Sequence, residues 1–133
     1  MRRTAAVIMA VMLMVGLAGC DTYCPAIGWI NTLRVDTGAI AGVAELQFCI
    51  DEECSPRADE TQPMGSVATM FRADQDGDDW TLNLDMTAPE SVVIRVFAAD
   101  GALLGESEHA IEWTPPTGRC GGASTAQSIV LAG

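Results

Sequence analysis

Several residue types that carry enzyme chemistry are scarce in this sequence. It contains no lysine and one histidine, His109, and aromatic residues make up 5% of it. A single histidine excludes any site that needs two, such as the H-E-x-x-H zinc site of proteases. The G-x-S-x-G motif around the nucleophile of α/β-hydrolases is absent as well. We therefore expect a protein that is not an enzyme and that carries no cofactor.

Positive charge is also in short supply. Seven arginines face 18 acidic residues, and two of the arginines, Arg2 and Arg3, stand at the N-terminus. The other five arginines leave residues 20–133 with a formal charge of −13. Such a surface repels the phosphates of nucleic acids and favours solubility. We therefore expect no nucleic acid among the partners.

The N-terminal segment has the pattern of a signal peptide. Arg2 and Arg3 precede an uncharged apolar run over residues 5–15, which extends at most to Ala18. This run is shorter than the roughly 20 residues that span about 30 Å of hydrocarbon. Residues 1–19 are therefore expected to form a helical signal peptide that is removed, and not a membrane-spanning helix.

The end of this segment resembles the lipobox of bacterial lipoproteins. In that motif, here Leu17-Ala18-Gly19-Cys20, the cysteine thiol takes a diacylglyceryl group and the peptide is cut just before the cysteine. The resemblance implies a chain anchored through Cys20 to the extracytoplasmic face of the cell membrane, with residues 20–23 as a short tether. Each buried methylene of an acyl chain contributes about 0.8 kcal/mol, so two chains give stable anchoring. The alternative is an ordinary secretory peptide with an incidental cysteine. Arg2-Arg3 is also found in twin-arginine signals, but Thr4-Ala5-Ala6 does not continue that pattern, so we expect the general secretory route.

Four cysteines follow the proposed anchor: Cys24, Cys49, Cys54 and Cys120. An even number in a small exported domain indicates two disulfides, and four cysteines allow three pairings. Spacing favours Cys49–Cys54 around a short loop and Cys24–Cys120 near the two ends of the domain. No pair has the C-x-x-C spacing of redox and zinc sites.

Short stretches after the tether have the sequence pattern of β-strands. Some alternate between apolar and polar residues and others are rich in Val, Ile and Phe, which are both typical of strands. In the stretch from Trp80 to Met86 the alternation places both of these residues on the inner face. Asp100-Gly101 indicates a two-residue hairpin turn. The expected strands are residues 31–36, 44–50, 65–72, 80–86, 91–98, 103–113 and 125–132.

About seven short strands separated by turn residues predict one all-β domain over residues 24–133. We expect an antiparallel β-sandwich of immunoglobulin-like or transthyretin-like type, with a small barrel as the alternative.

Some of these motifs resemble small, uncharacterised lipoproteins of high-GC bacteria. The resemblance rests on four features: the segment from Cys24 to Trp29, the Cys49 and Cys54 pair, the run from Val92 to Phe97 that leads to Asp100-Gly101, and a late cysteine before a final strand. It implies a disulfide-stapled, immunoglobulin-like sandwich. It implies no activity and no functional residues.

The acidic segment 74–79 is the best metal candidate. Asp74, Asp76 and Asp78 place carboxylates at alternate positions, which suits the oxygen ligands of calcium. The segment departs from an EF-hand loop because its glycine is at the fourth position and not at the sixth. Asp and Gly are favoured in turns, so a solvated hairpin turn between Phe71 and Trp80 is the favoured interpretation.

Other polar and aromatic residues have structural interpretations. His109 lies on the less polar side of the strand over 103–113, together with Leu103, Ser107 and Ile111, which favours a partly buried histidine without a catalytic role. Asp51, Glu52 and Glu53 occupy the expected disulfide loop, where exposure would not separate their pKa values. The three tryptophans, Trp29, Trp80 and Trp113, are expected in the core because the domain has few aromatics.

Three functions therefore remain open on the sequence alone. The first is a membrane-anchored extracytoplasmic module that binds or scaffolds a membrane-proximal protein. The second is a calcium-dependent or small-ligand-binding module. The third is a small envelope hydrolase.

Overall fold

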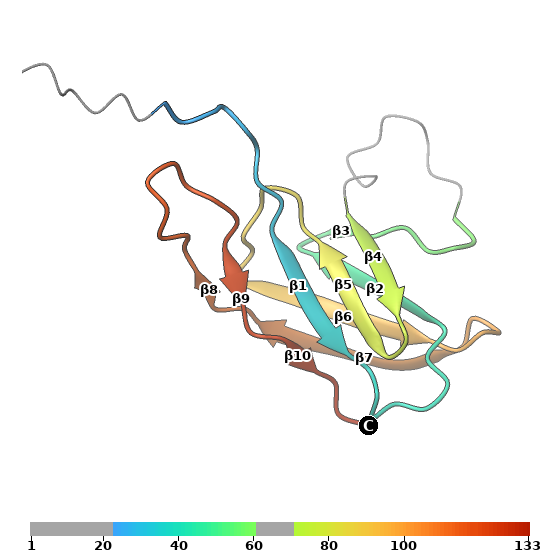
Figure 1. Cartoon of the computed structure of the whole chain (residues 1–133). Helices are drawn as coiled ribbons and strands as arrows, with labels where there is room; N and C mark the ends of the chain where they lie inside the picture. Colours follow the sequence, from blue (N-terminus) through green and yellow to red (C-terminus); the bar gives the residue numbers. More distant parts are fainter. Residues whose placement is uncertain (1–22, 61–70) are drawn as a thin grey trace, which may run out of the picture.

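Ten β-strands, and no helix, form the part of the chain described in the computed structural model, residues 23–60 and 71–133 (Figure 1). The strands are β1 Thr32–Asp36, β2 Glu45–Ile50, β3 Glu53–Cys54, β4 Arg72–Asp76, β5 Asp79–Asn83, β6 Ser91–Phe97, β7 Leu103–Ala110, β8 Trp113–Thr114, β9 Thr125–Ala126 and β10 Ile129–Val130. Over these residues the protein is all-β, as the sequence predicted.

Two four-stranded sheets carry most of the strands. One sheet has the order β10-β1-β5-β4, and the other has the order β3-β2-β6-β7. A third, two-stranded sheet joins β8 and β9. The two large sheets pack on each other through one apolar core, so the architecture is a sandwich and not a closed barrel.

The sandwich is not entirely antiparallel, which corrects the sequence expectation. β10 pairs with β1 in parallel, with Val35 opposite Ile129. Between β8 and β9 the chain makes an excursion over residues 115–124, and Cys120 is bonded to Cys24 at the end where β1 begins. The chain therefore re-enters the sheet from the same end as β1 and runs in the same direction.

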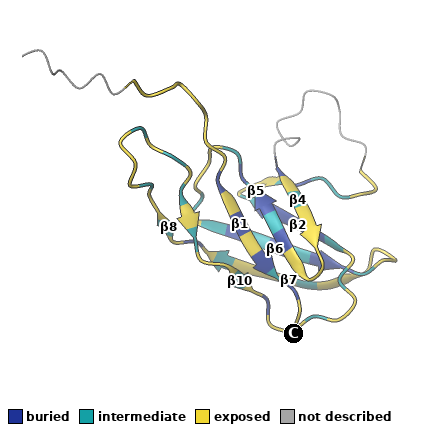
Figure 2. Ribbon diagram, in the orientation of Figure 1, coloured by how far each residue is buried: buried dark blue, intermediate teal, exposed yellow. Residues whose placement is uncertain are grey.

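Alternation of apolar and polar residues builds the core (Figure 2). Every second residue of the inner strands is buried, and the intervening residues are partly or fully exposed, except in β2 and at the end of β6, where Val96 and Phe97 are both buried at a register shift. The inward side chains of both sheets form one cluster: Leu33, Val35, Leu46, Phe48, Phe71, Trp80, Leu82, Leu84, Val92, Ile94, Val96, Ile111 and Leu131.

The strand expected over residues 80–86 ends earlier than predicted, and Met86 is exposed and not inward. β5 stops at Asn83, whose Oδ1 accepts a hydrogen bond from the N–H of Asp85 at 3.0 Å. Asp85 has a φ of 53°, which is left-handed and incompatible with a strand. β5 therefore ends at Asn83, although the alternation of apolar and polar residues continues to Met86.

The acidic segment 74–79 is mostly strand and only briefly turn. Asp74 and Asp76 belong to β4, and Asp76 lies opposite Asp79 of β5 across a two-residue connection at Gly77-Asp78. Gly77 has a φ of 65°, which glycine adopts without strain. Most of the strand expected over 65–72 falls on residues 61–70, which lie outside the described part.

Two of the later expected strands are divided. The stretch 103–113 becomes β7 and β8, and 125–132 becomes β9 and β10. The hairpin between β6 and β7 is present, but its connection has three residues, because Ala98 and Ala102 still form a backbone hydrogen bond. Gly101 takes a φ of 84° there, which is typical of a three-residue hairpin loop.

Residues 23–60 and 71–133 contain no helix that is long and apolar enough to cross a membrane. The expected signal peptide, Cys20 and all of the tether except Tyr23 fall on residues 1–22, outside the described part.

Candidate functional site

The two disulfides are the pairs that the spacing favoured. Cys24 is bonded to Cys120 across 96 positions of sequence, with their Cα atoms 5.1 Å apart. Cys49 is bonded to Cys54 across a tight turn between β2 and β3. The long bridge joins the segment that precedes β1 to the excursion 115–124, so the N-terminal segment of the described chain is covalently fixed to the domain.

Asn31 holds this same end together without covalent bonds. Its side-chain amide donates to the carbonyl of Thr87 at 2.8 Å, and its Oδ1 accepts from the N–H of Ser124 at 2.8 Å. Its backbone N–H donates to the carbonyl of Asp85, and its carbonyl accepts from the N–H of Leu84. Asn31 is 6% exposed. One buried residue therefore joins three segments that are distant in sequence.

We call these three segments, residues 23–30, 84–89 and 115–124, the Cys24–Cys120 end. They surround a shallow hollow of about 310 Å³ whose walls include Ile27, Trp29 and Met86. The sulfur of Met86 lies 2.9 Å from the position that a Cβ on Gly28 would occupy, so the two segments are in close contact. Nothing in the sequence alone indicated that residues 84–89 belong beside the N-terminal segment.

The calcium candidates do not converge. Asp74 pairs with Arg72, and Asp76 faces Asp79 across the hairpin. Asp78 uses its backbone carbonyl to accept hydrogen bonds from both the N–H and the hydroxyl of Thr37. Among residues 23–60 and 71–133, no three carboxylate, histidine or cysteine side chains gather as a metal site would require.

One side-chain contact bears on the hydrolase hypothesis. Ser107 Oγ lies 2.8 Å from His109 Nε2 on β7. Both residues are on the core-facing side of the sheet, because they lie opposite Ile94 and Val92. β7 is an edge strand, however, and Ser107 is exposed while His109 is half-buried. A serine and a histidine two positions apart on a strand meet as neighbours on one face, and such a contact does not by itself make a nucleophile.

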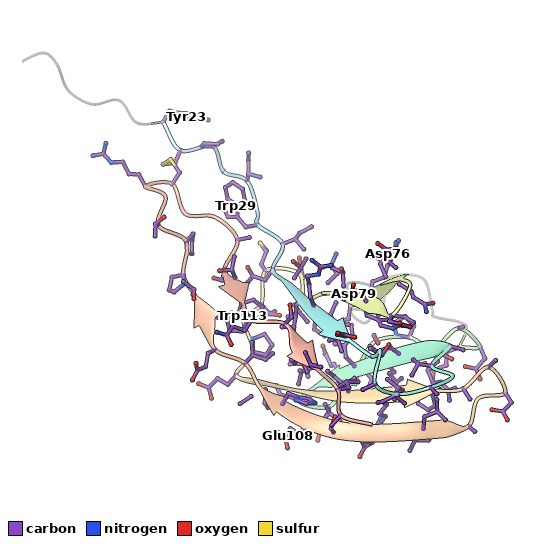
Figure 3. The ribbon with its side chains drawn as sticks, turned by 60° about the horizontal axis from the view of Figure 1, so that its bottom comes forward. Tyr23, Trp29, Asp76, Asp79, Glu108 and Trp113 are labelled. Atoms are coloured by element: carbon purple, nitrogen blue, oxygen red, sulfur yellow. A yellow bond between two sulfur atoms is a disulfide. The ribbon has the colours of Figure 1, made fainter. Side chains whose placement is uncertain are left out.

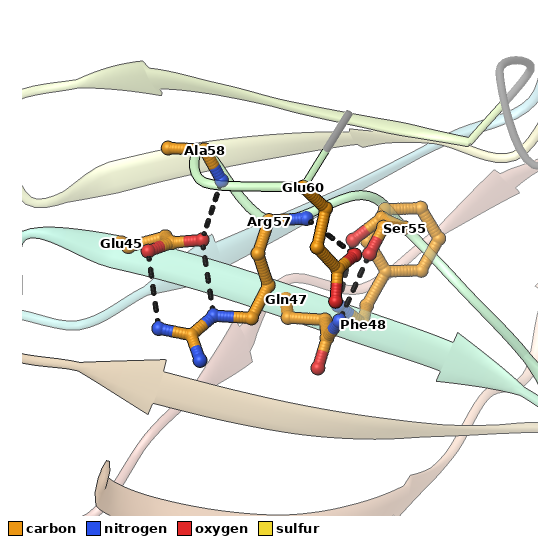
Figure 4. Close-up of polar contacts among 7 residues, drawn as sticks. All are labelled: Glu45, Gln47, Phe48, Ser55, Arg57, Ala58 and Glu60. Atoms are coloured by element: carbon orange, nitrogen blue, oxygen red, sulfur yellow. Dashed lines mark hydrogen bonds and ion pairs between the residues drawn. The ribbon is translucent and has the colours of Figure 1, made fainter. Parts of the chain in front are cut away.

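A segment that follows Cys54 covers the outer face of β2, which the sequence did not predict (Figure 4). Ser55 exchanges hydrogen bonds with Phe48, and its carbonyl accepts from Gln47 Nε2 at 3.0 Å. Arg57 pairs with Glu45 and lies 3.8 Å from the centre of the Phe97 ring. Gln47 is therefore buried although it lies on the face of β2 opposite the core residues Leu46 and Phe48.

The short disulfide is also shielded by a cation. Arg95 Nη1 lies 3.5 Å from Cys49 Sγ and 3.9 Å from Cys54 Sγ, and the same guanidinium pairs with Glu106. Asp51, Glu52 and Glu53 are exposed in the loop beside it. These contacts give the loop a structural role.

The three tryptophans differ in position. Trp80 is in the core, and Trp113 is half-buried with its Nε1 donating to the carbonyl of Pro89 at 2.8 Å. Trp29 is 42% exposed, so the prediction that it lies in the core is wrong.

A groove of about 430 Å³ runs beside Trp80, between the start of β2 and β4. Trp80 Nε1 is buried and has no hydrogen-bond partner among the described residues. Arg57 and Arg72 also line the groove, but each is paired with a carboxylate.

In comparisons with known proteins, no family model, no curated protein and no solved structure matches this chain.

Proposed function

We propose that this chain is a lipid-anchored extracytoplasmic lipoprotein whose β-sandwich binds or scaffolds a component close to the membrane. The observation that carries the proposal is the position of the long disulfide. Three residues separate Cys20 from Cys24, and Cys24 is fixed to the domain through Cys120. Four Cα-to-Cα steps extend to about 14 Å at most. A domain anchored at Cys20 therefore stays against the membrane.

The disulfides and the charge both support an extracytoplasmic location beside the membrane. Stable disulfides persist in oxidising, extracytoplasmic environments. A formal charge of −13 on residues 20–133 favours solubility beside the membrane and repels nucleic acid.

The lipid anchor is tested by intact mass and detergent phase partitioning. We expect a mature chain that begins at Cys20, carries a diacylglyceryl group and partitions into detergent. Cys20→Ser should leave the precursor uncut and unmodified, whereas Thr22→Ser, outside the lipobox, should behave like the wild type. A mature chain with no lipid mass would overturn the proposal.

The strand order favours one sandwich type over the other. In immunoglobulin domains the first two strands belong to the same sheet. Here β1 and β2 belong to different sheets. We therefore propose a transthyretin-like arrangement, with an additional strand β4 at one edge.

A small-ligand-binding module is the second candidate, and the groove beside Trp80 favours it. Trp80 Nε1 is closed off from solvent, so an acceptor would reach it only if the groove opened, and it would then recover the free energy that a buried donor without a partner costs. The indole N–H signals of the three tryptophans in NMR spectra provide the test, with a library of small hydrogen-bond acceptors as the probe. A shift confined to Trp80 supports binding in the groove, and the absence of any shift at Trp80 refutes it.

A further inference from the structure

The Cys24–Cys120 end exposes large apolar side chains. Tyr23 is 86% exposed, Ile27 57%, Trp29 42%, Ile30 53% and Met86 66%. These five residues come from two chain segments that the structure holds in contact through Asn31 and Met86. They account for most of the large hydrophobic residues that the described part of the chain exposes.

Charge is sparse within the three segments themselves, although the exposed carboxylates of Asp51, Glu52 and Glu53 in the β2–β3 turn border them at Thr87. The segments 23–30, 84–89 and 115–124 contain one carboxylate, Asp85, and one cation, Arg119. The rest of the domain is strongly acidic. Figure 3 shows Tyr23 and Trp29 along the N-terminal segment, far from Asp76 and Asp79 at the β4–β5 turn. The N-terminal segment thus presents apolar side chains away from the β4–β5 turn, which forms an acidic end of the domain, while the carboxylates of the β2–β3 turn border the apolar side chains on one side.

The acidic end is built by strand register. Asp36 of β1 lies opposite Asp79 of β5, which in turn lies opposite Asp76 of β4. β1 begins at the Cys24–Cys120 end and finishes at Asp36. The two ends of the same strand therefore point to surfaces of opposite character.

The position of the proposed anchor identifies what the apolar end contacts. Cys20 precedes Tyr23 by three residues, so a lipid on its sulfur would hold this end within about 11 Å of the lipid headgroups. Tyrosine and tryptophan are enriched at membrane interfaces because one part of the ring is apolar and another is polar. Apolar side chains of surface-bound elements enter the headgroup and acyl boundary by about 5–10 Å. The acidic end, in contrast, would be repelled by anionic lipid.

We infer that the Cys24–Cys120 end is a membrane-contact surface, in which Tyr23, Ile27, Trp29, Ile30 and Met86 enter the lipid interface and orient the domain with its acidic end outward. The inference rests on the proposed lipid anchor and goes beyond it, because it makes the folded domain itself a second membrane contact. It also fixes which face of the domain is available to a partner.

Fluorescence quenching in vesicles tests this contact. The lipidated protein is reconstituted into phosphatidylcholine and phosphatidylglycerol vesicles that contain lipids brominated at shallow or deep acyl positions. We expect the shallow bromines to quench part of the emission more strongly than the deep ones. That quenched part should disappear in Trp29→Phe and persist in Trp113→Phe, which removes the half-buried tryptophan of β8.

A charge variant gives a second measurement that does not require removal of a tryptophan. Ile27→Glu should keep the Cys24–Cys120 end out of the lipid interface and so abolish quenching by the shallow bromines. The lipid mass and the near-ultraviolet circular dichroism should stay unchanged. A lipidated protein whose quenching is the same in wild type and Trp29→Phe overturns the inference and leaves the anchor intact.

Two other outcomes would also overturn the inference. A protein without lipid mass defeats the anchor and the membrane contact together. A blue-shifted Trp29 emission that depends on protein concentration in detergent, without vesicles, would show that a second copy of the chain covers this end.

Discussion

Asn31 forms side-chain hydrogen bonds to residues that are far from it in the sequence. It is buried, and its side chain satisfies one carbonyl and one N–H from segments 56 and 93 positions away. Buried polar groups are costly when left without a partner, so the contribution of Asn31 is best measured by what its removal exposes.

Asn31→Ala should destabilise the domain by about 1–2 kcal/mol. The substitution removes two hydrogen bonds, each with a net contribution of about 0.5–1.5 kcal/mol, and water can partly replace Asn31 because Thr87 is exposed and Ser124 is half-buried. Urea unfolding with both disulfides intact measures the difference. Asn83→Ala is the matched control, since Asn83 Oδ1 accepts only a local hydrogen bond from Asp85, and its effect should be smaller. Equal effects would show that the long-range contacts of Asn31 add nothing.

The β4–β5 hairpin brings like charges together. Asp36, Asp79 and Asp76 occupy facing positions on three adjacent strands, and like charges directly opposite each other destabilise a sheet. Three carboxylates therefore lie in a row across one end of a sheet. They are not among any group of side chains in the described residues that could hold a metal ion.

Asp79→Asn should therefore stabilise the fold by roughly 0.2–1 kcal/mol, because it removes the central charge of the row. The gain should shrink as salt is added, since exposed charges are screened. Thermal unfolding at low and high ionic strength measures both effects. Glu52→Gln removes one charge from the exposed β2–β3 turn and should leave stability nearly unchanged; a comparable gain there would mean that net charge, and not the row, is responsible.

Calcium should not stabilise this hairpin. Asp74 is paired with Arg72, and Asp78 contributes its backbone to Thr37. We expect millimolar calcium to leave the melting temperature nearly unchanged, because a ligand raises stability only by binding the folded state. A clear rise that is lost in Asp76→Ala would reverse this interpretation.

The two disulfides should contribute unequally. The Cys24–Cys120 bridge closes a loop with a sequence separation of 96, and the Cys49–Cys54 bridge closes one of 5. The chain-entropy model gives about 4–5 kcal/mol for the long bridge and about 2 kcal/mol for the short one. Chemical unfolding of the two double alanine variants tests the order. A larger loss from the short bridge would indicate that its burial beside Arg95 outweighs loop entropy.

The molecule as a whole combines a short tether with a domain whose exposed apolar side chains lie close to that tether. Proteins that act far from the membrane use long, flexible linkers to span the distance. Here the Cys24–Cys120 bond fixes the domain a few residues after the proposed anchor. We therefore expect the partners to lie within one domain height of the bilayer.

A flexible insertion tests this restriction. Placing a Gly/Ser linker of about 30 residues after Asp21 would let the domain move several tens of ångströms from the bilayer. In-cell crosslinking of the natural chain should recover chiefly membrane-embedded neighbours, and the insertion should reduce that recovery. An unchanged set of crosslinked proteins would mean that closeness to the membrane is not what selects them. Thr22→Ser, which changes a tether residue but keeps the tether length, should leave the set of crosslinked proteins unchanged.

Local chemistry made some features of this protein predictable from sequence. Alternation of residues located the inner strands, because side chains on a strand point to opposite faces whatever the strand packs against. Spacing ranked the disulfides, and charge and the N-terminal motif led to the envelope hypothesis. Gly101 marked the hairpin because few other residues take a positive φ without strain.

Tertiary structure decided what depends on contacts between distant segments. The parallel pairing of β10 with β1 follows from where the Cys120 excursion returns to the sheet. The burial of Gln47 follows from the segment after Cys54 that covers β2, and that of Cys49 from its bond to Cys54 and from the Arg95 guanidinium above its sulfur. Trp29 and Met86 carry no sequence signal that separates them from core residues. They are exposed because β1 begins only after Trp29 and β5 ends before Met86, and Asn31 then holds their segments together at the same end of the sandwich. Periodicity gives the face of a strand, but only the packed chain determines which faces another segment covers.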